Sequence, residues 1–212
     1  MPGRFITFEG TEGAGKSTQI KLLAERIQAA GRKVHVLREP GGTPIGEEIR
    51  HTLQHSAQNA AMTPEAELLL LNASRAQLVR ETIRPALAAG EVVLCDRFYD
   101  STIAYQGFGR QLDLKIVRAV IDFAVGETRP DLTVLLMIPL ATSEARRESR
   151  AAGAALPRDR FEEADRDFFR RVEEGYRSIA AAEPKRVYSV DSTESLERVG
   201  ILIWDRVEAL LQ

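Results

Sequence analysis

The residues with the clearest chemical meaning form a glycine-rich segment near the start of the chain. Gly10-Thr11-Glu12-Gly13-Ala14-Gly15-Lys16-Ser17 matches the pattern G-x-x-x-x-G-K-[ST], and Thr18 follows it. Glycines let the backbone turn its N–H groups inward around an anion, and a following helix adds its positive end. Lys16 should reach the β and γ phosphates of a nucleoside triphosphate, and the Ser17 hydroxyl should take Mg²⁺. The segment therefore predicts a site for a magnesium-bound triphosphate.

This loop alone does not distinguish kinases from GTPases or motor ATPases. The chain has no N-K-x-D sequence to read guanine, and no D-x-x-G switch follows the third expected strand, so a GTPase is disfavoured. Three arginines, Arg38, Arg75 and Arg97, lie in or near segments expected at the same mouth. A planar guanidinium binds phosphate oxygens in pairs, so the trio suits an acceptor that carries its own phosphate. Each arginine could instead be a surface salt-bridge partner.

Short runs rich in β-forming residues alternate along the chain with longer helix-like stretches. This alternation predicts an α/β fold with a parallel sheet, because parallel neighbours need a crossover between them. We expect five strands, with helices on both faces of the sheet. The strand runs are 4–9, 33–37, 91–95, 132–138 and 186–190, and the helix runs are 16–30, 64–89, 114–125, 143–152, 165–182 and 195–211.

Glycines and strand ends indicate where ligands would lie. Gly31 and Gly90 each follow a helical run, where a left-handed C-cap residue is favoured. In open α/β sheets, ligands bind beyond the carboxyl ends of the strands. The segments that follow the first three strands, 10–18, 38–43 and 96–98, are polar or rich in glycine. We expect these three segments to converge.

Composition limits the class of protein. The 212 residues are 44% hydrophobic, enough for a full core, and we expect one domain over residues 1–212. Lys plus Arg number 29 against 31 Asp plus Glu, and this net charge of -2 disfavours nucleic-acid binding. The single cysteine, Cys95, cannot form an internal disulfide, and no Cys/His cluster has metal-ligand spacing, which suits a reducing cytoplasm. No stretch approaches about 18 apolar residues without charge, so we expect a soluble protein that does not enter a membrane.

A set of short motifs carries a resemblance to the thymidylate kinase family. The motifs are F-E-G at 8–10, R-E-P-G-G-T at 38–43, A-S-R-A-Q at 73–77, D-R-F at 96–98 and S-T-I-A-Y-Q at 101–106. By these motifs the chain resembles thymidylate kinases over nearly its whole length. R-E-P-G-G-T, and D-R-F followed by S-x-x-A-Y-Q, are specific to that family among nucleotide kinases. The resemblance implies a P-loop nucleoside monophosphate kinase fold, with a five-stranded parallel sheet, helices on both faces and an arginine-rich lid.

The resemblance also implies a reaction. This is direct in-line transfer of the γ-phosphoryl group from Mg-ATP to thymidine monophosphate, giving the diphosphate without a covalent enzyme intermediate. Family members are usually homodimers, and the run from Leu68 to Leu71 suits either a core or an interface. Two other interpretations remain. One is a different nucleoside monophosphate kinase, against which R-E-P-G-G-T argues, and the other is a P-loop ATPase or switch protein without a nucleotide acceptor.

The resemblance assigns roles around the acceptor residue by residue. Arg97 and Arg38 would help bind the acceptor phosphate. Arg75 would hydrogen-bond the thymine edge, and Glu12, inside the loop, would meet the sugar 3′-hydroxyl. Together with Lys16, Arg97 would therefore belong to the catalytic groups.

Further roles fall on the segment that follows the third strand. Ser101 should approach the base, and Gln106 should lie against the nucleotide. Tyr105 should sit beneath the deoxyribose, where a ribose 2′-OH would crowd it. Asp96 is the carboxylate expected to hold Mg²⁺ directly or through water. An aspartate is also favoured as a helix N-cap, and that alternative is compatible with the metal role.

One position departs from the family pattern. Four residues before Arg75 the family usually has an aromatic residue that stacks on thymine, and here that position is Leu71. The i, i+4 spacing still places both side chains on one helix face. Stacking on an aromatic ring is worth roughly 1–3 kcal/mol per base, and leucine would return only part of that. We expect weaker acceptor binding, or compensation by Phe98 or another ring.

An arginine-rich stretch, about 146–160, is the expected lid. It holds five arginines against two acidic residues, a local balance of +3, at Arg146, Arg147, Arg150, Arg158 and Arg160 against Glu148 and Asp159. A solvated helix face laced with ion pairs would explain such a run. However, small residues and Pro157 interrupt it, which favours a loop that opens and closes. Phosphoryl transfer needs a cation at the equatorial oxygens, and the P-loop's variable positions hold no arginine, so the lid would supply it. Arg150 is preferred over Arg147 for that role.

The segment 190–194 follows the last expected strand and opens the last helix. By the resemblance it would lie near the adenine. Helix capping by Ser192 or Thr193 explains the same residues equally well.

Overall fold

A parallel β-sheet forms the centre of the molecule, which a computed structural model describes over residues 2–153 and 165–212, without the side chains of 147, 148 and 150–153. Its five strands lie in the order β2-β3-β1-β4-β5. They are β1 Arg4–Glu9, β2 Val34–Arg38, β3 Val92–Asp96, β4 Leu132–Met137 and β5 Val187–Asp191. The predicted α/β fold is confirmed, and every predicted strand boundary lies within one residue of the observed one.

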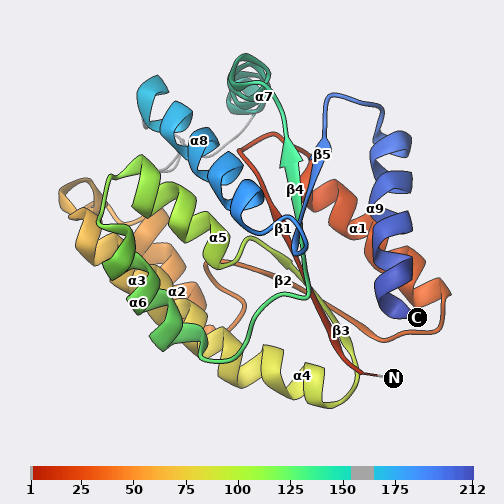
Figure 1. The fold of residues 1–212 in the computed structure, drawn as a ribbon. Coiled ribbons are helices and arrows are strands. Elements are labelled where there is room, and N and C mark those ends of the chain that lie inside the picture. The colour runs from red at the N-terminus through yellow and green to blue at the C-terminus, as the bar shows by residue number, and fades with distance from the viewer. Residues whose placement is uncertain (1, 154–164) are drawn as a thin grey trace.

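Helices cover both faces of this sheet, as predicted (Figure 1). Helices α1 Lys16–Ala29 and α9 Leu196–Leu211 pack on one face. The other face carries α3 Pro64–Leu78, α4 Arg84–Ala88, α5 Tyr99–Thr102, α6 Leu114–Val125 and α8 Arg166–Ala182. Helix α2 Pro44–Gln54 packs against α3, and α7 Leu140–Gly153 follows β4.

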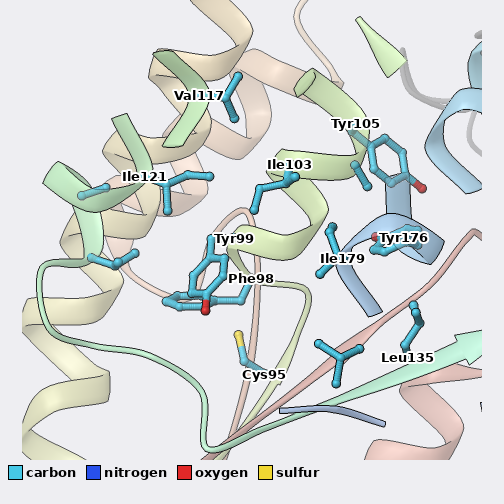
Figure 2. Packing of buried hydrophobic residues seen from close by; sticks show 14 of the residues in the cluster. Cys95, Phe98, Tyr99, Ile103, Tyr105, Val117, Ile121, Leu135, Tyr176 and Ile179 are labelled. Atoms are coloured by element: carbon cyan, nitrogen blue, oxygen red, sulfur yellow. The ribbon is translucent and has the colours of Figure 1, made fainter. Parts of the chain in front are cut away.

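Alternation along the strands divides the core into two clusters, one on each side of the sheet. Phe5 of β1 and Val93 of β3 point into the larger cluster, whereas their neighbours Ile6 and Leu94 point into the cluster under α1 and α9. Successive side chains of a strand point to opposite faces, so a strand buried on both sides is apolar throughout. Figure 2 shows part of the larger cluster, with Cys95 at its base. Because both clusters pack against the sheet, they hold its strands in place and so also the positions of the strands' carboxyl ends.

Three helical segments differ from the predictions. Helix α2 was not predicted, although Thr43 caps it by accepting a hydrogen bond from Gly46 N at 3.0 Å and Pro44 begins it. The stretch after β3 is also helical, through α5 and the π-helix η3 Ile103–Gly109. The single helix predicted over 64–89 is instead α3, the π-helix η2 Val79–Ile83 and α4 in succession. Pro85 has no N–H to donate to the preceding turn, which favours this wider local winding.

The carboxyl ends of three strands lie side by side. Asp96 of β3 pairs with Phe8 of β1 on one side and with Arg38 of β2 on the other. The predicted convergence of the segments that follow these strands is therefore confirmed. Gly31 and Gly90 both adopt a φ of 78° just after helices α1 and α4, as predicted. Among the described residues, no helix is both long and apolar enough to cross a membrane.

Candidate active site

The glycine-rich loop connects β1 directly to α1. Gly10, Gly13 and Gly15 have φ values of 129°, 79° and 89°, in the region that residues with a side chain rarely adopt. A Cβ at Gly10 would also lie 2.2 Å from the carbonyl oxygen of Leu136 in β4. Glycine is therefore required at this position by backbone conformation and by close packing. The turn sets the first residues of α1 at the edge of the sheet.

Lys16 is buried at the start of α1. Its Nζ donates to the carbonyl oxygens of Gly10 and Thr11, each at 3.1 Å. Burial, and then the nearby positive charge of Arg97, lower the pKa of Lys16 from 10.5 to about 8, although Asp96 and Glu12 act in the opposite direction. The ammonium group thus lies in a poorly solvated place, where an anionic ligand would stabilise its charge.

The hydroxyl of Ser17 and the carboxylate of Asp96 meet across the loop. Ser17 Oγ donates to Asp96 Oδ2 at 2.9 Å. Hydroxyl and carboxylate oxygens are the ligand types that Mg²⁺ prefers, and it usually takes one or two from protein and the rest from phosphates and water. The donor set therefore fits Mg²⁺. Among residues 2–153 and 165–212 there is no group of three or more His, Cys, Asp or Glu side chains placed to hold a metal ion.

A cavity of about 650 Å³ lies over the carboxyl ends of the strands. Most of the predicted site residues line it: Glu12, Gly13, Gly15, Lys16, Ser17, Thr18, Arg38, Leu71, Arg75, Asp96, Arg97, Ser101, Tyr105 and Gln106. Gly10, Thr11 and Ala14 are buried within the loop and do not line the cavity. The structure thus brings the donor and acceptor residues of the sequence prediction around one space.

Arg97 stands at the centre of a cluster of polar side chains that lies at the cavity. Its φ of 69° is unusual for a residue with a side chain, and the surrounding contacts hold it there. Nη1 donates to Ser101 Oγ at 3.1 Å and to the Tyr176 hydroxyl at 3.3 Å. Nη2 donates to Glu12 Oε2 and to the Tyr105 hydroxyl, both at 3.4 Å. The guanidinium is therefore oriented by four side chains from three different elements and the loop.

Glu9 and Tyr176 belong to this cluster and were not predicted. Glu9 is fully buried and accepts from Phe98 N at 2.8 Å, Ser101 Oγ at 2.6 Å and the Tyr176 hydroxyl at 2.9 Å. Burial raises the pKa of Glu9, and the nearby Asp100 raises it further. Ser101, expected to approach the base, lines the cavity but donates its hydroxyl hydrogen to Glu9. A glutamate at the end of the first strand run, directly before the glycine-rich loop, was the available signal for Glu9. No pattern around Tyr176 marked it.

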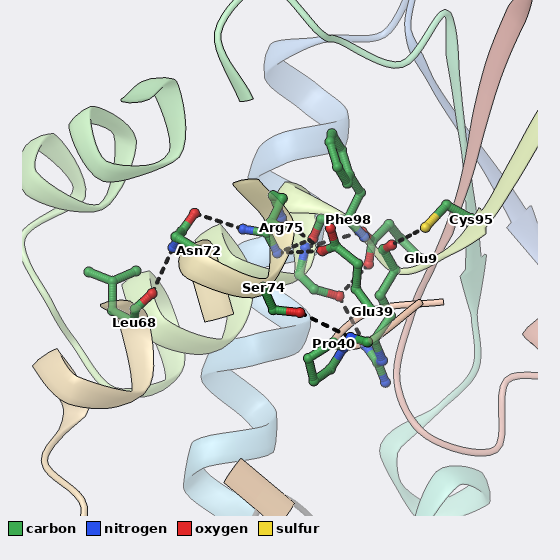
Figure 3. Close-up of polar contacts among 12 residues, drawn as sticks. Glu9, Glu39, Pro40, Leu68, Asn72, Ser74, Arg75, Cys95 and Phe98 are labelled. Atoms are coloured by element: carbon green, nitrogen blue, oxygen red, sulfur yellow. Dashed lines mark hydrogen bonds and ion pairs between the residues drawn. The ribbon is translucent and has the colours of Figure 1, made fainter. Parts of the chain in front are cut away.

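Arg75 is deeply buried and fixed on several sides (Figure 3). Nε donates to Glu39 Oε2 at 2.8 Å, and Nη2 lies 2.7 Å from the same oxygen. Nη1 donates to Asn72 Oδ1 at 2.9 Å, and Nη2 donates to the Phe98 carbonyl at 3.2 Å. Its side chain is 2% exposed, so the alternative of a surface salt bridge is wrong for Arg75. Burial raises the pKa of Glu39 to about 7, although Arg75 opposes the shift.

Arg38 differs from Arg75 because it lies at the rim. Its two terminal nitrogens donate to the two carboxylate oxygens of Glu47 at 2.7 and 3.0 Å. Both side chains are close to half-exposed, at 49% and 43%. The surface salt-bridge alternative therefore describes Arg38 in this structure, although Arg38 also lines the cavity. Glu47 further accepts from Gly42 N at 2.7 Å.

Leu71 and Phe98 are the two residues from which an apolar surface for the base was expected, and both line the cavity. Leu71 and Arg75 line the cavity from one face of α3, as their spacing predicted. Phe98 also lines it, but its ring packs into the core against Phe5, with centroids 4.9 Å apart. Gln106 lines the cavity while donating to Glu67 Oε1 at 2.9 Å.

Helix α7 contacts the glycine-rich loop. Ser143 Oγ donates to the Glu12 carbonyl at 2.7 Å, and Arg146 Nη1 donates to the Gly13 carbonyl at 2.8 Å. Arg146 also lines the cavity, although it was not one of the two arginines preferred from sequence. The side chains of Arg147 and Arg150 lie outside the described part of the structure. Residues 154–164, with Arg158 and Arg160, lie outside it as well.

Two helix-capping alternatives are wrong. Helix α9 is capped by Ser195, whose side chain accepts from Arg198 N at 3.2 Å, and not by Ser192 or Thr193. Ser192 Oγ instead donates to the Ala14 carbonyl of the loop at 2.6 Å. Asp96 does not cap α5, whose N-cap is Phe98 without a side-chain hydrogen bond.

Comparisons with known proteins point to a single family. A family model described as thymidylate kinase matches residues 8–203. A thymidylate kinase of Citrifermentans bemidjiense is 46% identical over 99% of this chain and 93% of the relative, and one of Geobacter sulfurreducens is 49% identical over 96% and 95%. The crystal structure of thymidylate kinase from Ehrlichia chaffeensis superposes with a TM-score of 0.77 at 31% identity, covering 98% of this chain and 99% of that one.

Proposed function

The chain belongs to the thymidylate kinase family and phosphorylates thymidine monophosphate to the diphosphate, and we propose how its own residues carry out this transfer. The observation that supports the proposal is one cavity in which Lys16 and Ser17 of the loop stand together with Arg75 and Arg97. The first pair suits a triphosphate with Mg²⁺, and the second suits an acceptor that has a base and a phosphate.

On the donor side, ATP binds at residues 10–18. The N–H groups of the loop and the first turn of α1 surround the phosphates, since such a turn forms an anion nest. Lys16 exchanges its two carbonyl partners for the β and γ phosphate oxygens. Ser17 and Asp96 would hold Mg²⁺, which would neutralise part of the charge on the phosphates.

On the acceptor side, Arg97 and Arg38 bind the phosphate of thymidine monophosphate. Arg75 donates to the thymine edge above Leu71. Further positions follow the family resemblance: Glu12 meets the 3′-hydroxyl, Tyr105 lies beneath the deoxyribose, Ser101 approaches the base and Gln106 lies against the nucleotide.

The transfer is a direct in-line displacement. An oxygen of the acceptor phosphate forms a bond to the γ-phosphorus as the bond from that phosphorus to the β–γ bridging oxygen breaks, and ADP leaves. Positioning and charge do the catalytic work in this reaction. An arginine of the lid, Arg150 or its neighbour Arg147, stabilises the equatorial oxygens, and Arg146 contributes from the loop side.

The protein also acts as a homodimer in the cytoplasm, with residues 1–212 as one domain. Helices α2, α3 and α6 pack side by side. The dimer is supported by the large apolar side chains that these helices expose: Ile45, Leu69, Ile116 and Phe123. A buried free thiol at Cys95 suits a reducing compartment. Sedimentation velocity on the wild type and on Phe123→Glu tests the dimer. A wild-type monomer would contradict it.

The function is tested by ADP release from Mg-ATP with one acceptor at a time. Thymidine, deoxyuridine, deoxycytidine, adenosine and guanosine monophosphates are each supplied alone, with Lys16→Ala as the inactive control. We expect release to be strongest with thymidine monophosphate. Release that is independent of every acceptor would instead identify a P-loop ATPase or switch protein.

A further inference from the structure

The buried contact between Glu39 and Arg75 joins two segments that both line the cavity. Glu39 follows β2 directly, and Arg75 lies 36 residues further along, in α3. Their side chains are 3% and 2% exposed. Ser74, next to Arg75, accepts from Gly41 N at 3.1 Å, so the same two segments are joined a second time (Figure 3). The pair is therefore part of the cavity wall.

The contacts of Arg75 occupy nearly all its donors. A guanidinium has five N–H groups, one on Nε and two on each terminal nitrogen. Nε donates to Glu39 Oε2, one Nη2 hydrogen to the Phe98 carbonyl, and one Nη1 hydrogen to Asn72. Nη2 also forms an ion pair with Glu39 Oε2 at 2.7 Å. Among the described residues, no acceptor meets the second Nη1 hydrogen. The protein thus fixes the group and leaves one donor for a ligand in the cavity.

The two carboxylate oxygens of Glu39 have different surroundings, and this difference indicates the role of the residue. Glu39 Oε1 is buried and has no hydrogen-bond partner among the described residues. A buried carboxylate that serves only stability would be expected to satisfy both oxygens. Glu39 instead directs one oxygen, Oε2, at two nitrogens of Arg75. This arrangement holds the guanidinium of Arg75 in one orientation.

We propose that Glu39 is a positioning and specificity-determining residue, which fixes Arg75 so that its one remaining Nη1 hydrogen meets a carbonyl oxygen of the acceptor base. This inference rests on the proposed contact between Arg75 and the thymine edge. Arginine donates and never accepts, so a base with a carbonyl at that point is bound, and a base with an amino group there meets donor against donor. Thymine and uracil have that carbonyl, whereas cytosine has the amino group. A loosely held Arg75 could turn away from the amino group of cytosine. The preference of the enzyme for thymine over cytosine would then fall.

The test compares Glu39→Gln with the wild type, using thymidine and deoxycytidine monophosphates as acceptors. The amide keeps the size of the side chain but cannot accept from Nε and Nη2 at one charged oxygen. We expect KM for thymidine monophosphate to rise about tenfold or more, with KM for ATP within about twofold. The value of kcat/KM for thymidine monophosphate divided by that for deoxycytidine monophosphate should fall by about tenfold or more. Glu91→Gln is the matched control, because Glu91 forms ion pairs with Lys33 and His35 away from the cavity.

Each outcome decides the point. A folded Glu39→Gln variant that retains the wild-type acceptor ratio would overturn the positioning role while leaving the reaction itself intact. A wild type with no preference between the two acceptors would overturn the proposed base contact of Arg75. If Glu39→Gln does not fold, the same ratio is measured in Asn72→Ala, which releases the Nη1 side of Arg75. A reduced ratio there supports the proposal, and an unchanged one overturns it.

Discussion

Ser17 Oγ lies 2.9 Å from Asp96 Oδ2, and this hydrogen bond joins the phosphate-binding loop to the carboxyl end of β3. We predict that Asp96→Asn raises the Mg²⁺ concentration needed for half-maximal activity by about tenfold or more, because an amide is a weaker Mg²⁺ ligand than a carboxylate. Magnesium titration of the rate, and of the thermal shift with ADP, measures this change. Equal Mg²⁺ midpoints in wild type and variant would remove Asp96 from the metal site.

The lowered pKa of Lys16 predicts a pH limit for ATP binding. With a pKa of about 8 in the free protein, Lys16 is charged below that pH and loses its proton as the pH rises through it. Since kcat/KM reports the free enzyme, kcat/KM for ATP should fall above about pH 8. A rate profile from pH 6 to 10 measures this. In Lys16→Arg the alkaline decline should disappear, because arginine stays charged. A decline that persists there would have another cause.

Tyr176 should act through Arg97. Its hydroxyl donates to Glu9 and accepts from Arg97 Nη1, so Tyr176→Phe leaves both with one contact fewer. We predict that KM for thymidine monophosphate rises about fivefold, that KM for ATP changes little, and that stability falls by about 1–2 kcal/mol. Steady-state kinetics and urea unfolding measure these effects. Tyr188→Phe, on β5 and away from the cavity, should change none of them. Equal rises in both KM values would argue against a specific role.

Leu71→Phe should tighten acceptor binding. Leucine stands where the family usually has a stacking ring, and the ring of Phe98 is committed to the core. A phenylalanine at 71 could regain part of the ~1–3 kcal/mol that stacking contributes per base. Calorimetry of thymidine monophosphate binding measures the change. Leu69→Phe is the control, since Leu69 lies on the same helix, 58% exposed and outside the cavity. Equal affinity in wild type and Leu71→Phe would show that the platform is not deficient.

The lid arginines can be separated by kinetics. We predict that Arg150→Ala lowers kcat by about tenfold or more with little change in ATP affinity, because it removes charge needed at the transition state. Arg146→Ala, which loses the hydrogen bond to the Gly13 carbonyl, is measured in parallel. A large fall in kcat for Arg146→Ala alone would transfer the role to that residue.

Local patterns were enough to predict the sheet and the loop. The central strands were visible because they are buried on both faces and therefore apolar almost throughout, as in residues 92–95. The edge strands β2 and β5 are only partly buried, and their β-branched and apolar residues still marked them. The loop was visible because its glycines, Lys16 and Ser17 have a fixed spacing. Helix α2 had a local signal as well, in Thr43 followed by Pro44, but the motif at 38–43 was read only for chemistry.

Contacts between distant residues could not be predicted in the same way. The pair of Glu39 and Arg75 is separated by 36 residues, and the pair of Glu9 and Tyr176 by 167. Which buried acid meets which donor depends on the packing of α3 and α8 against the sheet, and no local spacing encodes it. The bidentate partner of Arg38, Glu47, is only nine residues away, but it lies in α2, which was not predicted, so this contact was not foreseen either.

Three consecutive carbonyls of the phosphate-binding loop are held from outside. Ser143 donates to Glu12, Arg146 to Gly13, and Ser192 to Ala14. These hydrogen bonds restrict the loop before any nucleotide arrives, so part of the conformational entropy of ordering it is lost during folding and not during binding. Two of the three donors come from α7. A movement of α7 would therefore loosen the loop, so the position of this helix and the affinity of the loop for phosphates would be coupled.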